Sequence, residues 1–435
     1  MKTELSNPPS SLTRWLQSTH GFWFVLFTTL SVFCLYTCVF ALRKTYSVAT
    51  FDGVTLWGYD YKGFLVISQV LGYGLSKFIG IKIIAELHSK SRAGGILCMI
   101  SIAMVSWFLF AIVPAPYNII FLFTNGFPLG MIWGMVFGYL EGRRYTEVLG
   151  AGLSVSFIFS AGFAKSVGGW IMRDWGTSPY WMPFVAGCLF MLPLLLFLWL
   201  LNQVPPPSSI DEALRTRRQP MNRAERKKFI ANFLPGIVLF VLAYTLLTAF
   251  RDLRDNYSAE VWNLLGYGNS PDIFTRTEVP VSIMVLVCIG SLMIIKNNKL
   301  ALMINHTIVM LGMALIGVAT YLFELKMVDA PTWMILIGLG LYLGYVPFNS
   351  IFFDRLMAAF KYTGTVGFIM YIADSFGYLG SIGVVFFKMF GYAKLSWVTF
   401  FIHSGYFISI AGTLLIFGSM IYFHYKHQAW KKINP

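Results

Sequence analysis

Several basic residues lie within or at the edge of long apolar segments, where a charge needs a chemical reason. They are Arg43, Lys77, Lys82, Lys165 and Arg251, with Arg254 close behind the last. A charge at the centre of a bilayer costs at least about 2.5–3.5 kcal/mol, so such residues usually face a polar cavity. Arginine side chains hold phosphate and carboxylate oxygens through paired hydrogen bonds and stay charged at physiological pH. The pattern therefore predicts a site for a small anion.

Some of these residues also have a plain structural interpretation. Arg43, in FALRKTYSVAT, could extend to the membrane surface beside Lys44. Lys82 could pair with Glu86 one turn later, and we favour that structural role for it. Lys77 lies near the middle of its segment, in GYGLSKFIG, where reaching the surface is difficult. Arg43 and Lys77 are accordingly predicted to contact the substrate.

For the remaining basic residues, the sequence leaves the choice between a binding role and a structural role open. Lys165, in SAGFAKSVGGW, stands among glycines and could face either a cavity or a close helix interface. Arg251 and Arg254 lie in AFRDLRDNY, and the sequence does not say which of them binds. The structural alternative for this pair is a helix end at which neighbouring aspartates solvate both arginines.

One acid, Asp374 in YIADSFGYLG, also lies in an apolar segment. It could partner a cationic side chain, carry a proton or accept a hydrogen bond from a polyol, and a structural ion pair is equally consistent. Tyr46, Tyr73 and Asn349 are further predicted polar contacts for the substrate.

The elements that must position these residues are membrane-spanning helices. The chain has 435 residues, 57% hydrophobic and 12% charged, whereas soluble domains are about 25% charged. Apolar runs of spanning length predict twelve segments, near 21–50, 61–87, 93–113, 118–140, 147–172, 180–202, 229–254, 278–295, 300–323, 332–354, 362–388 and 397–425. This pattern predicts an all-α, polytopic membrane protein. The first segment is too long for a signal peptide and is expected to stay as an anchor.

The basic residues also predict an orientation. With a cytoplasmic N-terminus, most of the 33 Lys and Arg residues fall on cytoplasmic loops, as the positive-inside rule requires. Both termini are therefore expected in the cytoplasm, with the protein in the cell (inner) membrane. The net charge of +14 then reflects topology, and binding to nucleic acid is not expected.

One long linker divides the chain into two halves. Residues 203–228 are Pro-rich and then strongly basic, and they separate predicted six-helix bundles over residues 1–202 and 229–435. Six helices plus six around a basic central loop is the layout of the major facilitator fold. A short repeat, Arg-x-x-Tyr-Ser, ends the first segment at Arg43–Ser47 and the seventh at Arg254–Ser258.

The stretch ALRKTYSVA, followed in the second segment by the lysine of GLSKFIG, resembles the organophosphate:phosphate antiporters of the major facilitator superfamily. NGFPLGMIWG, GYVPFNS and FGYLGS agree in place and character. The resemblance implies phosphate-binding arginines in helices 1 and 7, which map to Arg43 and Arg251, and an assisting lysine, which maps to Lys77. The sequence departs from the family in the fifth segment, where SVSFIFSAGFAKS lacks the family's histidine.

These observations predict a secondary transporter that moves a phosphorylated small metabolite or another organic anion by alternating access, with exchange for inorganic phosphate as one mode. A proton-coupled anion symporter that uses Asp374 is the first alternative. A membrane sensor of a metabolite phosphate, docking a partner through the linker, is the second. No catalytic constellation or metal-ligand spacing is present in the sequence, so no enzyme, metal or cofactor is predicted. The expected partners are the bilayer and a small anion, and the chain is expected to be a monomer.

Overall fold

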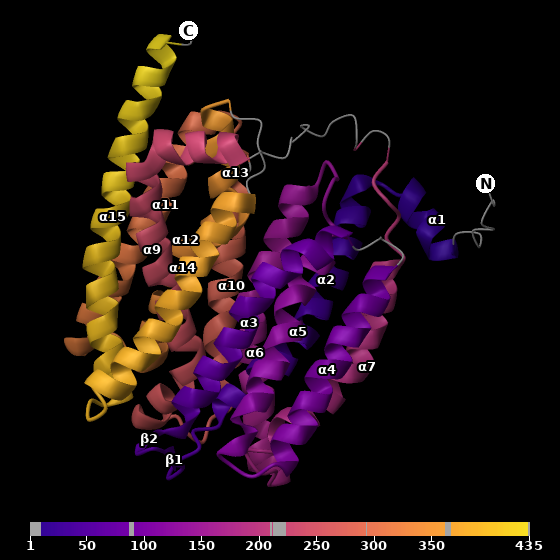
Figure 1. Cartoon of the computed structure of the whole chain (residues 1–435), viewed down its shortest axis with the longest axis vertical. Coiled ribbons are helices and arrows are strands. Elements are labelled where there is room, and N and C mark those ends of the chain that lie inside the picture. Colours follow the sequence, from indigo (N-terminus) through magenta and orange to yellow (C-terminus); the bar gives the residue numbers. More distant parts are fainter. Residues whose placement is uncertain are drawn as a thin grey trace.

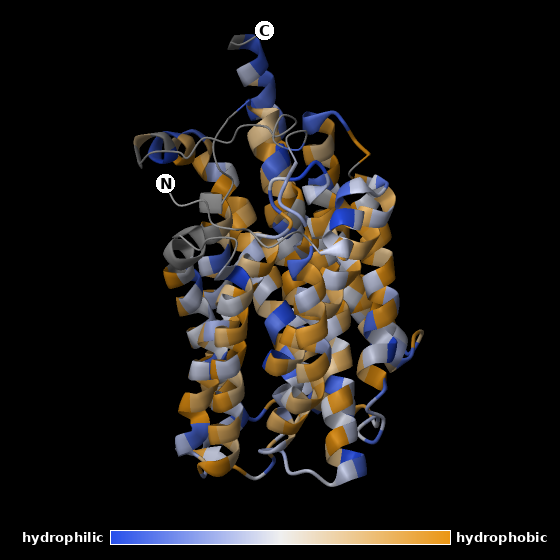
Figure 2. Ribbon diagram, turned by 90° about the vertical axis from the view of Figure 1, so that its right-hand side faces the viewer, coloured by the Kyte–Doolittle hydropathy of each residue, from blue (hydrophilic) through white to orange (hydrophobic). Residues whose placement is uncertain are grey.

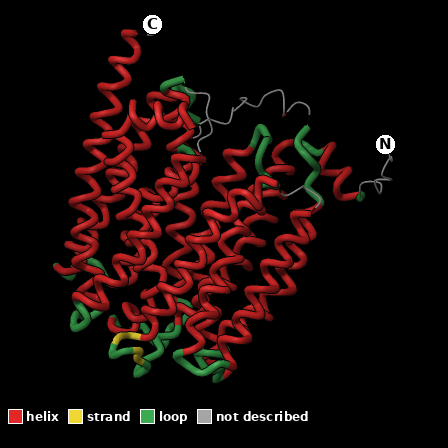
Figure 3. Tube along the Cα trace, viewed as in Figure 1, coloured by secondary structure: helices red, strands yellow, loops and turns green. Residues whose placement is uncertain are grey.

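The structure is a computed structural model that describes residues 10–86, 91–208, 211, 223–292, 294–361 and 367–433. Helices make up most of this chain (Figure 3). The only strands among the described residues form a short antiparallel hairpin, β1 (Thr55–Leu56) and β2 (Tyr59–Asp60), in which Thr55 lies opposite Asp60. The predicted all-α class is confirmed.

Twelve long helices follow one another along the chain. They are α2 (Gly21–Lys44), α3 (Tyr61–Glu86), α4 (Arg92–Ile112), α5 (Ile120–Phe137), α6 (Thr146–Trp175), α7 (Met182–Asn202), α9 (Arg223–Leu264), α10 (Ile273–Leu292), α11 (Asn298–Glu324), α12 (Ala330–Ser350), α14 (Gly367–Phe386) and α15 (Trp397–Ile433). Eleven helical spans of the described residues are long and apolar enough to cross a membrane. The remaining helix, α3, has 26 residues and packs against α5 and α14. The eleven spans together with α3 correspond in place to the twelve predicted segments, and the chain is a multi-pass membrane protein.

Shorter elements connect these helices. They are α1 (Ser11–Ser18), α13 (Phe352–Ala359), the 3-10 turns η1 (Thr45–Val48) and η3 (Tyr117–Ile119), and the π-helical turn η4 (Phe387–Gly391). The helix α1 and the end of α15 lie at the end of the molecule opposite to β1 and β2 (Figure 1). Hydrophilic residues are prominent at the C-terminal end of α15, beyond the apolar length of the bundle (Figure 2).

The seventh helix differs from its predicted boundary. It was expected to end at residue 254, but α9 continues to Leu264. Buried apolar side chains such as Leu253, Tyr257 and Trp262 continue its packed face past that point. The structural alternative for Arg251 and Arg254 is therefore wrong about a helix end, because both residues lie in the interior of a helix, but the expected contact with a neighbouring aspartate is present between Arg251 and Asp252.

Helices pack mainly within two groups. In the first, α2 packs against α6 and α7, and α5 against α3 and α4. In the second, α9 packs against α14 and α15, and α11 against α12 and α15. The groups meet chiefly where α6 packs on α10 and α3 on α14. This packing supports the predicted domains at 1–202 and 229–435. Residues 209–210 and 212–222 of the predicted linker lie outside the described residues.

Close helix packing in the first group depends on glycines. A Cβ atom on Gly126 of α5 would press against the backbone carbonyl oxygen of Gln69 in α3, and one on Gly72 of α3 would press against that of Phe123. A backbone atom in a packed interface cannot move aside as a flexible side chain can. The two helices therefore approach each other at a distance that only glycine permits.

We expect Gly126→Ala to lower the melting temperature of the detergent-solubilised protein, with a destabilisation of about 1–3 kcal/mol from overpacking. Gly94→Ala in α4 is the matched control, because its Cβ would meet no atom within 4 Å. Equal melting temperatures for the two variants would contradict the close α3–α5 contact.

Candidate functional site

Two basic side chains from the first helix group lie against one tyrosine. The guanidinium carbon of Arg43, at the end of α2, lies 3.6 Å from the centre of the Tyr73 ring in α3. The Lys77 ammonium, one turn further along α3, is 5.1 Å from the same ring and 5.4 Å from the ring of Trp133 in α5. Aromatic faces attract cations through their quadrupole, so Tyr73 holds both charges at once.

These two cations have no anionic partner in direct contact. Within the described part of the chain, neither the Arg43 guanidinium nor the Lys77 ammonium forms a hydrogen bond or ion pair, and the buried Nε of Arg43 has no partner. Arg43 is only 8% exposed. A buried charge without a counter-ion is strongly unfavourable. The pair is therefore a place where a bound anion would be stabilised.

The second helix group meets this pair through another tyrosine. The Tyr378 ring of α14 lies 5.6 Å from the Tyr73 ring. Arg43 and Arg251 both interact electrostatically with Tyr378 and with Asp252. The structure thus brings an arginine from each half of the chain to one place.

Arg251 of α9 has its own partners there. Its Nη2 lies 2.7 Å from Asp252 Oδ1, its guanidinium lies over the ring of Tyr345 at 4.4 Å, and it donates a hydrogen bond to the Tyr345 hydroxyl. The Tyr345 ring of α12 stacks on that of Tyr244 in α9. The charge of Arg251 is therefore partly balanced inside the protein.

Asp374 of α14 completes the arrangement. It accepts a hydrogen bond of 2.5 Å from the Tyr244 hydroxyl and interacts electrostatically with Lys77 and Arg251. We call the whole set the central cluster: Arg43, Tyr73, Lys77, Tyr244, Arg251, Asp252, Tyr345, Asp374 and Tyr378. It contains three cations and two carboxylates, so one positive charge remains uncompensated.

Arg254 and Lys165 lie elsewhere. Arg254 forms an ion pair with Glu278 of α10 at 2.6 Å and donates to the carbonyl oxygen of Met334. The Lys165 ammonium donates to the carbonyl oxygen of Asp255 at 3.1 Å and to Ser258 Oγ at 3.0 Å. Of the alternatives for Lys165, the structure places it in a helix interface, and it leaves Arg251 as the arginine of α9 in the central cluster.

The other predicted contacts are more peripheral. Tyr46 is fully buried, its ring packs 5.7 Å from that of Trp107, and within the described ranges its hydroxyl has no hydrogen-bond partner. Asn349 donates to the carbonyl oxygen of Tyr345 at 3.2 Å. The side chain of Lys82 lies outside the described part of the structure.

Sequence reasoning missed a network that joins the two halves at the β1–β2 end. The Lys62 ammonium forms an ion pair of 2.5 Å with Glu260, and the Lys44 ammonium donates to Asn256 Oδ1 at 2.7 Å. With Lys165 these contacts connect α2, α3 and α6 to α9, and we call them the interface network. The signal in the sequence was the helical spacing of Tyr257 and Val261, which indicates that the helix and its packed face continue past residue 254.

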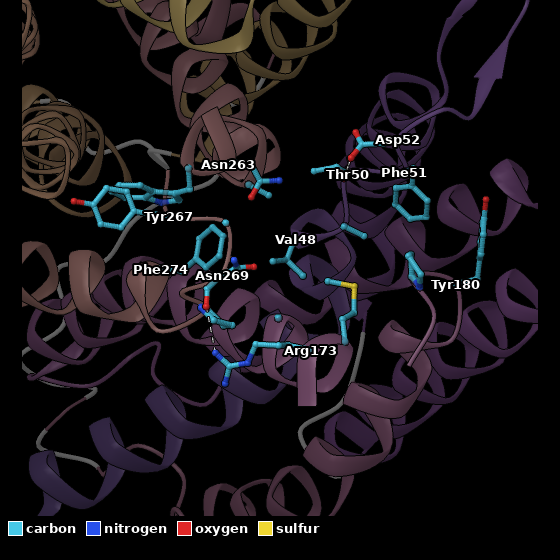
Figure 4. A pocket seen from close by; sticks show the side chains of 18 of the residues that line it. Val48, Thr50, Phe51, Asp52, Arg173, Tyr180, Asn263, Tyr267, Asn269 and Phe274 are labelled. Atoms are coloured by element: carbon cyan, nitrogen blue, oxygen red, sulfur yellow. Dashed lines mark hydrogen bonds between the residues drawn. The ribbon is translucent and has the colours of Figure 1, made fainter. Parts of the chain in front are cut away.

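A cavity of about 620 Å³ lies beside the interface network. Its walls come from η1 and the segment after it, from α6, α9 and the start of α10, and from the segments between α6 and α7 and between α9 and α10. Figure 4 shows Phe51, Tyr180 and Phe274 around it, with Asn263 and Arg173. No residue of the central cluster lines it, so it is a separate space at the β1–β2 end.

Comparison with solved structures shows the fold. The major facilitator superfamily proton:xylose symporter XylE, from E. coli, has a TM-score of 0.59 and 15% identity over 92% of this chain and 95% of that chain. A structure of a proton-dependent oligopeptide transporter gives 0.60 and 11% over 92% and 100%. The nucleoside transporter NupG gives 0.58 and 14% over 92% and 99%. The fold is therefore the major facilitator fold.

The sequence comparison is more specific about family. A family model described as "Family of unknown function (DUF5690)" matches residues 45–426, and the chain belongs to this family. No curated protein matches the sequence. These matches lend no support to the resemblance to organophosphate antiporters.

The Lys62–Glu260 pair offers a direct test of the interface network. Lys62 is fully buried and the Glu260 side chain is 11% exposed. We expect Glu260→Gln to leave Lys62 as an unpaired buried charge and to destabilise the protein by about 3–5 kcal/mol, measured as a lower melting temperature in detergent. The double variant Lys62→Met/Glu260→Gln should recover most of this loss.

The control is Asp174→Asn, which removes an exposed ion pair with Arg173 whose side chains are both 48% exposed. Such a surface pair contributes about 0–1 kcal/mol, so its loss should hardly move the melting temperature. A Glu260→Gln variant as stable as Asp174→Asn would show that the interface network does not hold the halves together.

Proposed function

We propose that the protein is a secondary transporter that moves a small organic anion by alternating access, with the central cluster as its binding site. The observation that carries the proposal is the pair of cations, Arg43 and Lys77, gathered on Tyr73 without a protein anion in contact. The three structural relatives named above are transporters by their titles, and they support transport as the activity of this fold. They do not support a particular substrate here.

A phosphorylated small metabolite is the substrate class that we propose. Phosphate oxygens match the fork of a guanidinium group, and a lysine adds a point charge. A phosphate ester would neutralise the excess positive charge of the central cluster, and the resemblance of the Arg43 and Lys77 motifs to organophosphate antiporters supports the same class. A carboxylate is a second anion that the cluster would hold.

The arrangement of contacts supports exchange as the mode of transport. The site lies between the helix groups, and both groups contribute an arginine to it. A bound anion stabilises the closed approach of these charges, and an empty site does not, so reorientation is faster when the site is loaded. With the β1–β2 end outside, as the positive-inside rule predicts, the interface network closes the outer side. A single chain supplies the whole site, consistent with a monomer.

Transport in proteoliposomes tests the proposal. With inorganic phosphate inside, external phosphate esters should drive efflux of internal phosphate without a proton gradient. Arg43→Ala should reduce this exchange by at least about tenfold, because it removes a charge-assisted contact of about 1.5–3 kcal/mol. Arg276→Ala, a change on an exposed arginine, is the control and should exchange like the wild type.

Two results would reject the substrate class or the activity. If phosphate esters neither drive efflux nor compete, the substrate is not a phosphate ester. If they bind to the solubilised protein and no flux is measured, the protein is a sensor and not a carrier.

Asp374 favours a second candidate, proton-coupled symport of an anion. Its carboxylate lies next to the tyrosines that hold Arg251, so gaining a proton there would change the charge that balances the site. Two of the structural relatives are described as proton-coupled for xylose and for oligopeptides.

Asp374→Asn distinguishes the two modes. Under symport, the variant should lose uptake driven by an inward proton gradient and should retain exchange at equal pH. Under exchange without protons, uptake by the wild type should be the same with and without the gradient, and the variant should change only the affinity. Uptake in both conditions is measured with a labelled anion in the same vesicles.

A further inference from the structure

The contact between Arg251 and Asp252 is incomplete in a way that the proposed function does not explain. Arg251 Nη2 and Nε both reach the same oxygen, Oδ1, at 2.7 and 3.1 Å. The other oxygen, Oδ2, is buried and has no hydrogen-bond partner among the residues that the structure describes. The favourable geometry for an arginine and a carboxylate uses both oxygens in parallel. Here half of the carboxylate is left unsatisfied, although Asp252 is only 4% exposed.

The positions of the two residues on the helix account for this geometry. Adjacent residues on a helix do not face each other, so the Arg251 side chain must bend across to reach its neighbour. A free anion that approached the guanidinium from the central cluster would not have this restriction. It could use two oxygens where Asp252 uses one.

Asp252 also faces cations from the other half of the chain. Arg43 and Lys44 of α2 both interact electrostatically with its carboxylate. The Lys44 ammonium is held at the interface by a hydrogen bond to Asn256, one turn beyond Asp252 on α9. A carboxylate released by Arg251 therefore has a second cation beside it.

We propose that Asp252 is an internal counter-anion, which occupies Arg251 while the site is empty and is displaced from it toward Lys44 by the anionic substrate. This inference rests on the proposed function. It adds a residue that sets the affinity for the anion and the rate at which the empty carrier reorients. Asp252 competes with the substrate for Arg251, which lowers affinity. It also balances one charge of the empty site, which permits some reorientation without substrate.

The test compares Asp252→Asn with the wild type. The substitution keeps the shape and removes the charge. Binding of inorganic phosphate to the detergent-solubilised protein, measured by calorimetry, should become about tenfold tighter, since a single charge contact at a partly buried site is of that order. In proteoliposomes, efflux of phosphate into phosphate-free buffer should fall relative to efflux into buffer with phosphate.

Two further variants control for other effects. Asp252→Glu restores the charge and should return both measurements toward the wild type. Glu278→Gln removes an equally buried carboxylate, 4% exposed, that pairs with Arg254 outside the central cluster. It should leave phosphate affinity unchanged, even where it lowers the melting temperature.

The outcomes separate this inference from the proposed function. If the wild type binds and exchanges phosphate but Asp252→Asn binds it equally or more weakly, the counter-anion role is wrong and the transport proposal stands. If Asp252→Asn and Asp252→Ser both fail to fold while Asp252→Glu folds, the carboxylate is structural and the inference is overturned. If the wild type neither binds nor moves phosphate, the proposed function fails and the inference fails with it.

Discussion

The structure depends on one constraint. Positive charges lie buried in the described part of this membrane protein without a protein anion in contact with them. Arg43 and Lys77 share the face of Tyr73, and an aromatic face recovers only about 0.5–2 kcal/mol per cation. This is enough to help hold the side chains in place and too little to satisfy them. A protein carboxylate in direct contact would have removed the demand for a ligand. The tyrosine does not remove the need for an anionic ligand. Helices from both halves of the chain surround the two cations.

Cations at the interface between the halves, in contrast, have protein acceptors in direct contact. Lys62 has Glu260, Arg254 has Glu278, and Lys165 has a carbonyl and a hydroxyl oxygen. These cations are buried at least as deeply as Arg43, but each is in contact with its own acceptors. Burial alone therefore does not distinguish a binding residue from a structural one in this protein. The distinction lies in whether the charged group has an acceptor from the protein in direct contact.

This distinction explains what the sequence predicted and what it did not. Helix number and the location of the first arginine followed from apolar length and from a charge that a lipid environment does not tolerate. The choice between Arg251 and Arg254 did not follow, because residues three apart lie on neighbouring faces of one helix. The choice is made by Glu278 on α10 and Tyr345 on α12, which are distant in sequence. Likewise, Lys62 and Glu260 belong to opposite halves, and no local pattern relates them.

The repeat Arg-x-x-Tyr-Ser is a second case in which the sequence alone does not determine the partners of an arginine. It relates Arg43 to Arg254 by position, but the two residues have different surroundings, since Arg254 pairs with Glu278 and Arg43 has no ion-pair partner in the described part of the chain. The repeated segments do meet, because Lys44 of the first contacts Asn256 of the second. The second repeat therefore contributes to closing one end of the molecule, and the arginine that accompanies Arg43 lies one turn earlier on α9. One continuous helix thus carries both the contact that closes the halves and the contact that a substrate would compete for. Arg251 and the nearest contact of the interface network, the carbonyl oxygen of Asp255, are only four residues apart on this helix.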